Sequence, residues 1–126
     1  MIVMKLIDTN VFVDYLRNHA PAIKFFESLQ AKEAVFSAIT EAELVAGKDC
    51  SDRRKKELTL HFIHQWEKIL VSNPIAILAG DLVRENGLAL PDALIAATAV
   101  LSNAELVTRN VKHFQKVPGL KVKEPY

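Results

Sequence analysis

Short apolar segments alternate with longer amphipathic segments along this chain, and this alternation restricts the fold more than any other feature. Residues 2–7, 34–36 and 105–108 are rich in aliphatic and β-branched side chains, as in strands that are covered on both faces. Between these segments, apolar residues recur at helical spacing. The pattern predicts an α/β sandwich with a short, mainly parallel sheet flanked by helices. One more short strand is expected near residues 121–122.

Polar residues, proline and glycine predict where several helices begin and end. Thr40, followed three residues later by Glu43, has the spacing of a capping box, and Gly47 predicts the end of that helix. A long helix is expected from Asp52 to Ile69, because apolar residues recur along it at steps of four and three. Further helices should follow residues 8–10, start near residues 20–21, cover residues 73–86 and begin at residues 91–92.

Length and composition indicate one ordinary globular domain spanning residues 1–126. The net charge of +1, from 16 basic and 15 acidic residues, gives no global positive field for nucleic acid, so such binding would need a local patch. The single Cys50 excludes an intrachain disulfide and fits a reducing compartment. The apolar stretch 93–101 is far shorter than the roughly 18 residues of a membrane span. A soluble, cytoplasmic protein is therefore expected.

Several common catalytic sites are absent from the sequence. The first glycine is Gly47, so no glycine-rich phosphate loop follows the first strand. There is also no Gly-x-Ser-x-Gly motif for an acyl-transfer serine. Cys50 lies among Asp49, Ser51 and Asp52, an acidic setting that disfavours a reactive thiolate.

Two other polar groups have both a functional and a structural interpretation. His61 and His64 could bind a metal, but no third ligand at a metal-motif spacing is evident, and a solvated helix face is favoured. The run Arg53-Arg54-Lys55-Lys56 is the only dense basic run, and it stands at a helix start, where positive charge opposes the helix dipole. It is a candidate contact for an RNA backbone, although a solvated helix start remains the commoner explanation.

Four residues form the main candidate site: Asp8, Glu43, Asp92 and Asn110. Each has a local structural explanation as a cap, a capping-box partner or a turn residue. Together, however, Asp8, Glu43 and Asn110 are expected just after strand ends, and Asp92 opens a helix. Ligands bind at the carboxyl edge of an open parallel sheet. The sequence therefore predicts an acidic cleft there.

Three carboxylates brought together repel one another unless a cation neutralises them. A hard divalent cation, Mg²⁺ or Mn²⁺, bound by Asp8, Glu43 and Asp92 is the usual solution. A cluster of this kind lacks a nucleophile of its own and suits attack of a metal-activated water on a phosphodiester. Nearby polar side chains are expected to orient the ligands or a water molecule: Thr9, Asn10 and Thr108.

Four blocks of the sequence resemble the PIN-domain nucleases, and more narrowly the VapC-type toxin ribonucleases of toxin–antitoxin pairs. They are Asp8-Thr9-Asn10, the segment 40–47 with Glu43 and Gly47, the segment 91–99 that begins Pro91-Asp92, and the segment 106–114 with Thr108-Arg109-Asn110. The resemblance implies Mg²⁺-dependent RNA cleavage, a homodimer and inhibition by a cognate antitoxin. It places the family's acids on Asp8, Glu43 and Asp92. Asn110 stands where the family often has Asp, so a water-positioning role is expected for it rather than direct metal ligation.

Two alternative functions remain open. Asp8 could be the nucleophile of an aspartyl-phosphate phosphohydrolase, although that chemistry needs a second carboxylate where this chain has Asn10. A non-catalytic RNA- or protein-binding module is the other alternative, and the presence of all three acids argues against it.

Overall fold

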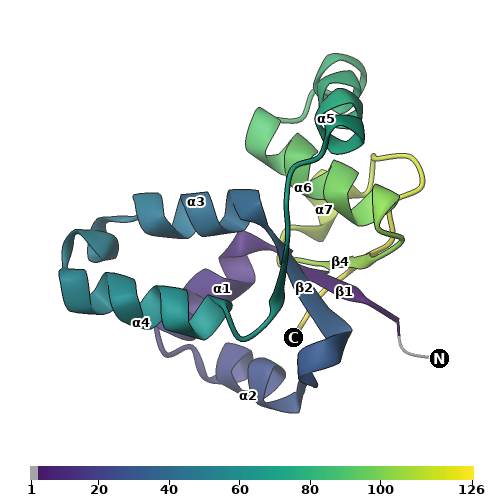
Figure 1. Ribbon diagram of the computed structural model, residues 1–126. Helices are drawn as coiled ribbons and strands as arrows, with labels where there is room; N and C mark the ends of the chain where they lie inside the picture. The colour runs from purple at the N-terminus through teal and green to yellow at the C-terminus, as the bar shows by residue number, and fades with distance from the viewer. Residues whose placement is uncertain (1–2) are drawn as a thin grey trace.

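The computed structural model describes residues 3–126 and contains a sheet whose strands, within that part of the chain, all pair in parallel (Figure 1). The strand order is β3-β2-β1-β4-β5. The strands are β1 (Lys5–Ile7), β2 (Ala34–Ser37), β3 (Glu67–Ile69), β4 (Glu105–Val107) and β5 (Val122–Lys123). The α/β prediction is confirmed. Ile2, which the predicted first strand included, lies outside the described residues.

Helices connect the strands, as parallel pairing requires. They are α1 (Thr9–Leu16), α2 (Ala20–Ser28), α3 (Ala38–Ala46), α4 (Arg53–Ile63), α5 (Asn73–Asn86), α6 (Leu90–Leu101) and α7 (Val111–Phe114). Two short 3₁₀ turns, η1 (Ala31–Glu33) and η2 (Lys48–Ser51), complete the connections. Among residues 3–126, no helix has both the length and the apolar character needed to cross a bilayer.

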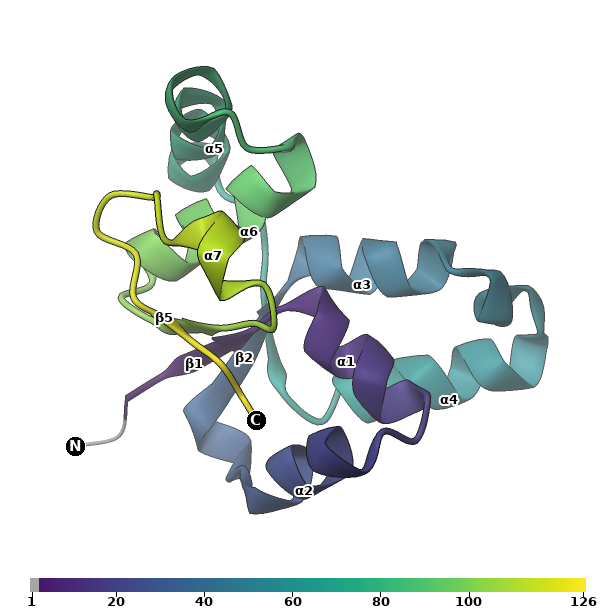
Figure 2. The same ribbon diagram turned by 180° about the vertical axis from the view of Figure 1, so that it is seen from behind.

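The sheet separates two hydrophobic cores, and neighbouring residues of each inner strand point into different ones. Leu6 and Leu106 face a core formed with α5, α6 and α7, whereas Ile7 and Val107 face a core formed with α1, α2 and α4. Figures 1 and 2 show these two groups of helices on either side of the strands. Side chains alternate between the two faces of a strand. A strand made of consecutive apolar residues therefore buries both of its faces and needs helices packed on each side of the sheet.

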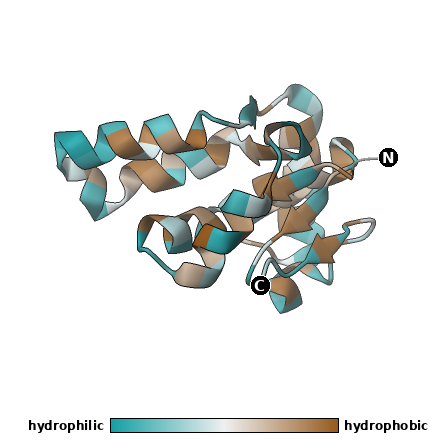
Figure 3. Ribbon diagram, turned by 90° about the horizontal axis from the view of Figure 1, so that it is seen from below, coloured by the Kyte–Doolittle hydropathy of each residue, from teal (hydrophilic) through white to brown (hydrophobic). Residues whose placement is uncertain are grey.

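The helices α3 and α4 form an arm that extends beyond the sheet. They run side by side and are joined at their outer end by η2 (Figures 1 and 2). The outer end of the arm is largely hydrophilic, whereas its hydrophobic residues gather where it meets the rest of the molecule (Figure 3). The arm therefore projects a polar surface next to the carboxyl edge of the sheet.

The predicted long helix from Asp52 to Ile69 is wrong in its second half. Helix α4 ends at Ile63, and residues 67–69 form the edge strand β3, which pairs with β2. Trp66 and Ile69 still pack against the protein, but they join the two different cores. The edge of β2 offers unpaired backbone groups, and pairing with them outweighs the continuation of a helix.

The predicted capping box at Thr40 and Glu43 is also wrong. The cap of helix α3 lies three residues earlier, at Ser37, whose side chain accepts a hydrogen bond from the backbone N–H of Ile39 at 3.0 Å. Strand β2 runs directly into the helix, so its last residue is the cap. This earlier start places Thr40 in the buried first turn and Glu43 one turn further along α3, not directly after a strand.

Candidate active site

Asp8 directly follows β1 and caps α1, so it is fixed at the carboxyl edge of the sheet. Its Oδ1 accepts a hydrogen bond from the backbone N–H of Thr9 at 2.8 Å, and its Oδ2 accepts one from the hydroxyl of Thr108 at 2.7 Å. Its backbone N–H donates to the carbonyl of Val107 in β4. Asp8 is only 6% exposed. Both carboxylate oxygens are thus oriented by the junctions of β1 and β4.

Thr108 connects Asp8 to the other polar residues that follow β4. Its Oγ1 accepts hydrogen bonds from the Asn110 backbone N–H at 3.0 Å and from the Asn10 side-chain amide at 3.4 Å. Asn10 also accepts a hydrogen bond from the backbone N–H of Arg109 at 3.4 Å. Asn110 is exposed at the start of α7 and makes no side-chain capping bond there, so its amide is not needed as a cap.

Glu43 reaches the same edge from α3. Its Oε1 accepts a hydrogen bond from the hydroxyl of Thr9 at 2.7 Å. The Thr9 hydroxyl also hydrogen-bonds to that of Thr40 at 3.0 Å. Because Thr40 is fully buried, this chain of hydroxyl groups ties the exposed Glu43 carboxylate to a rigid part of the fold.

Asp92 lies in the first turn of α6, where its negative charge is favourable to the helix dipole. Its Oδ2 is 2.9 Å from Nε2 of His113 on α7. The sequence pattern does not single out His113, although it lies in the last of the four resemblance blocks. Its contact with Asp92 depends on the packing of α7 beside α6, which no local spacing reveals.

Burial and neighbouring charges raise the pKa of Asp8 to about 6. Burial is the largest cause, and the negative charges of Asp92 and Glu43 add to it. The hydrogen bonds from Thr108 and Thr9 act in the opposite direction and lower the pKa. The negative charges of Asp92 and Glu43 therefore both act on the buried carboxyl group of Asp8.

The donor set of this edge fits a hard divalent cation. Three carboxylates supply oxygen ligands of the kind that Mg²⁺ and Mn²⁺ prefer, and none of the three contacts a lysine or arginine among the ion pairs of residues 3–126. Over those same residues, no three His, Cys, Asp or Glu side chains converge into a ready-made metal cage. The acids share one edge, with Glu43 bonded to Thr9 and Asp92 to His113.

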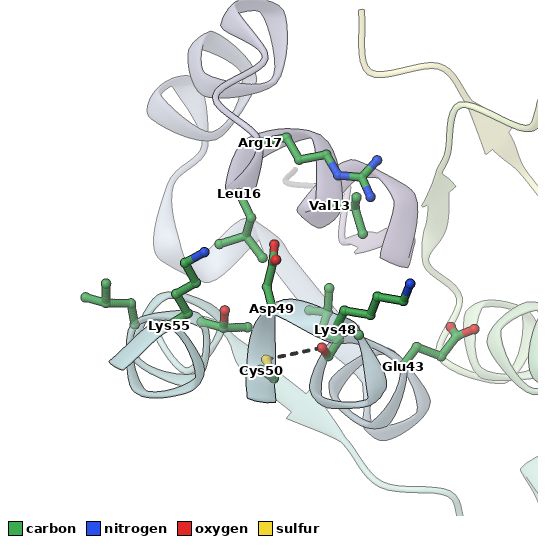
Figure 4. A pocket seen from close by; sticks show the side chains of 12 residues that line it. Val13, Leu16, Arg17, Glu43, Lys48, Asp49, Cys50 and Lys55 are labelled. Carbon is green, nitrogen blue, oxygen red and sulfur yellow. Dashed lines mark hydrogen bonds between the residues drawn. The ribbon is translucent and has the colours of Figure 1, made fainter. Parts of the chain in front are cut away.

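A groove of about 540 Å³ opens beside Glu43, between α1, α3 and α4 (Figure 4). Of the four residues in the basic run 53–56, Lys55 lines this groove. Arg53 instead pairs with Glu57 along α4, at 3.3 Å. Cys50 also lines the groove, and its thiol donates a hydrogen bond to the carbonyl of Leu44.

Two further residues that the sequence analysis named form contacts with other acids. His64 hydrogen-bonds to Glu41, which also accepts a hydrogen bond from Lys68 at 3.1 Å. Arg109 follows Thr108, but its guanidinium pairs with Asp14 at 2.9 Å.

Comparison with known proteins gives a consistent result over the whole chain. The family model for the PIN domain matches residues 5–120. The chain is 36% identical over 124 residues to a protein of Mycobacterium tuberculosis named Ribonuclease VapC19, an alignment that covers 93% of this chain and 97% of that protein.

Two solved structures have closely similar folds. One is a toxin–antitoxin complex from Klebsiella pneumoniae, whose matching chain is 34% identical with a TM-score of 0.83, covering 97% of this chain and 98% of that one. The other is VapBC2 from Rickettsia felis bound to a DNA fragment from its promoter, 29% identical with a TM-score of 0.79, covering 96% and 98%.

Proposed function

The chain belongs to the PIN-domain family, and from this membership we propose that it is the toxin endoribonuclease of a type II, VapBC-like toxin–antitoxin pair. A relative named as a VapC ribonuclease aligns with it along almost the full length of both chains. The fold is that of the matching chain in a toxin–antitoxin complex. The observation in this chain that carries the proposal is the buried Asp8 at the carboxyl edge of the sheet, whose pKa the neighbouring charges of Asp92 and Glu43 help to raise.

We further propose that the nuclease depends on Mg²⁺ or Mn²⁺, with Asp8, Glu43 and Asp92 as ligands. A divalent ion at such a site neutralises charge on the scissile phosphate and lowers the pKa of a bound water molecule. The repulsion of Asp8 by Asp92 and Glu43 supports this proposal, because a cation is the usual compensation for neighbouring carboxylates.

The surrounding residues orient these acids. Thr108 and the Thr9 backbone fix both oxygens of Asp8, the Thr9 hydroxyl fixes Glu43, and His113 contacts Asp92. Asn10 supports Thr108. The amide of Asn110, exposed at the same edge, is placed to orient a water molecule or an RNA oxygen. Ligands that are fixed in this way lose little freedom when the site is filled.

The proposed partners are an RNA substrate, a second copy of the chain and a cognate antitoxin, and the proposed location is the cytoplasm. The Klebsiella pneumoniae structure, by its title a toxin–antitoxin complex, supports the antitoxin.

RNA cleavage by the purified protein tests this function. Total cellular RNA, a tRNA pool and a mixed set of structured RNAs are incubated with Mg²⁺, with Mn²⁺ or with EDTA, and new RNA ends are mapped. We expect cleavage that requires the divalent ion and is lost in Asp8→Asn. Asp81→Asn, which neutralises an acid on the remote helix α5, should cleave like the wild type.

Cleavage that persists in EDTA would contradict the metal dependence. If no RNA in any of the three sets is cleaved with either ion, the ribonuclease assignment is wrong.

A further inference from the structure

The groove beside Glu43 joins the candidate active site to the arm formed by α3 and α4. Its apolar floor includes Val13 and Leu16 of α1, Leu44 of α3 and Leu58 of α4. Leu58 is 55% exposed, a high value for a leucine. The groove's volume, about 540 Å³, lies within the usual range of ligand-binding clefts. Of the three acids, Glu43 lines this groove, so the groove adjoins the candidate site.

Three basic side chains line this groove: Arg17, Lys48 and Lys55. They come from three separate elements, the end of α1, the turn η2 and the helix α4. In Figure 4, Arg17 and Lys48 extend toward the side on which Glu43 lies, and Lys55 lies at the other end. The lining also includes two acids, Glu43 and Asp49, so positive charge prevails in the groove.

These three basic residues are available to a ligand. All three are exposed, and none takes part in an ion pair within the part of the chain that the structure describes. Several other basic residues contrast with them. Lys5, Lys68, Arg53, Arg84 and Arg109 each pair with an acidic side chain.

We propose that this groove binds the RNA strand on one side of the scissile phosphate, with Arg17, Lys48 and Lys55 contacting its phosphates. The inference rests on the proposed ribonuclease function and adds the path of the substrate. Within the basic run 53–56 it selects Lys55, which shares the groove with residues distant in sequence, whereas Arg53 pairs with Glu57.

The chemistry of the groove favours a single RNA strand. Proteins that bind single strands combine a positive groove for the backbone with apolar surfaces that cover the bases. Arg17, Lys48 and Lys55 lie at different places along the lining, so they can contact more than one phosphate of a strand. The exposed Leu16 and Leu58 supply apolar surface in the same lining.

Binding measured in EDTA separates substrate contact from cleavage. A fluorescently labelled single-stranded RNA of mixed sequence is titrated with the wild type and with the variant Arg17→Gln/Lys48→Gln/Lys55→Gln over a range of salt concentrations. The slope of log K against log salt should become shallower by about 2, since each lost contact to a single-stranded phosphate removes about 0.7. At low salt we expect binding at least roughly tenfold weaker.

A charge-matched control uses Lys24→Gln/Lys32→Gln/Lys116→Gln. These lysines are exposed and lie outside the groove. Their replacement reduces the net charge by the same amount as the groove variant. This control should keep the salt slope of the wild type. A second pair tests the floor: Leu58→Glu should weaken RNA binding, whereas Leu70→Glu, at a leucine that is 67% exposed and outside the groove, should not.

The outcomes distinguish a failure of the proposed RNA path from a failure of the proposed ribonuclease function. If the wild type cleaves RNA and the groove variant has an unchanged affinity, salt slope and KM, the RNA path is wrong and the ribonuclease stands. A groove that receives a segment of a protein partner would give this result and overturn the proposal. If the wild type neither binds nor cleaves any RNA, the proposed function itself fails. An increase in KM with kcat little changed supports the groove.

Discussion

Asp8 combines a structural role with an electrostatic cost. Its side chain caps α1 and accepts a hydrogen bond from the Thr108 hydroxyl, which stabilises the junction of β1 and α1. Its charge, however, is buried beside two other acids, and its pKa is raised to about 6. A residue that served only as a cap would not need this burial.

Replacing Asp8 with Asn should therefore stabilise the metal-free protein while abolishing cleavage. The rise from 3.8 to about 6 corresponds to roughly 1–3 kcal/mol of unfavourable interaction at neutral pH. Asn keeps an oxygen that caps the helix. Thermal melts in EDTA should show a higher melting temperature for Asp8→Asn than for the wild type. Added Mg²⁺ should raise the melting temperature of the wild type only, because a ligand stabilises the state that binds it. Equal stabilisation of both proteins by Mg²⁺ would show that Asp8 is not a ligand.

The same raised pKa predicts how the stability of the metal-free protein depends on pH. Between about pH 4 and pH 6 the folded protein binds a proton at Asp8 that the unfolded chain, with its value near 3.8, does not bind. The stability of the wild type relative to Asp8→Asn should therefore increase as the pH falls through about 6. Urea melts of both proteins in EDTA from pH 7 to pH 4 measure this difference. A constant difference would mean that Asp8 titrates normally in the fold.

Thr9 should act as a positioning residue for Glu43. Thr9→Val keeps the shape of the side chain but removes the hydroxyl that donates to Glu43. We expect metal affinity and cleavage to fall by about 10–100-fold, as is typical when a ligand's supporting hydrogen bond is lost. Thr9→Ser restores a hydroxyl and should recover most of both. If Thr9→Val binds metal as the wild type does, the hydrogen bond is not needed to position Glu43.

At the scale of elements, the site depends on direct junctions between strands and helices. The residue directly after β1, Asp8, caps α1, and the last residue of β2, Ser37, caps α3. Such junctions leave few free torsion angles, so Asp8 and the start of α3 are fixed by the sheet itself. The precision of the site is therefore a property of the elements and not of loops.

Gly80, inside α5, and Gly87, at its end, should respond in opposite ways when each is replaced by alanine. Gly87 ends the helix with a φ of 70°, a left-handed conformation that costs an alanine about 1 kcal/mol. Gly80 lies inside the helix, and an added Cβ there meets nothing within 4 Å. Gly87→Ala should lower the free energy of unfolding, and Gly80→Ala should raise it by about 1 kcal/mol. Chemical denaturation measures both, and a shift of the same sign would contradict the assigned backbone conformations.

At the scale of the whole molecule, one thin sheet unites two cores. Leu6 and Ile7 are adjacent and fully or almost fully buried, yet they belong to different cores. Because the strands are short and shared, neither core has a sheet of its own. The molecule should unfold as one cooperative unit.

Leu6→Ala tests this cooperativity. The substitution should cost about 2–5 kcal/mol, because it leaves a cavity in the core formed with α5 and α6. Trp66, the only tryptophan, packs against the opposite core. Its fluorescence should nevertheless report the same shifted urea midpoint as the far-ultraviolet circular dichroism. Two separated midpoints would show that the cores unfold independently.

Much of the fold is encoded in local sequence signals. The apolar strands around Leu6, Val35 and Leu106 and the alternation with helices determine a parallel α/β sandwich, which the structure confirms. The predicted helix from Asn73 to Asn86 and the stop at Gly47 are also confirmed, since proline, glycine and capping residues act within a few residues of themselves.

Other features were decided by partners that are distant in sequence. The strand β3 forms because β2 offers an edge, so the helical spacing that reaches Ile69 was misleading. The contact of His113 with Asp92 joins residues 21 apart, and the groove brings Arg17 beside Lys48 and Lys55. The sequence by itself determined the class of fold and predicted which acids form the candidate site, because these depend on short-range periodicity and on residue type. Only the tertiary structure decided which side chains hold those acids and where a substrate strand has free positive charge, because both depend on long-range packing between helices and sheet.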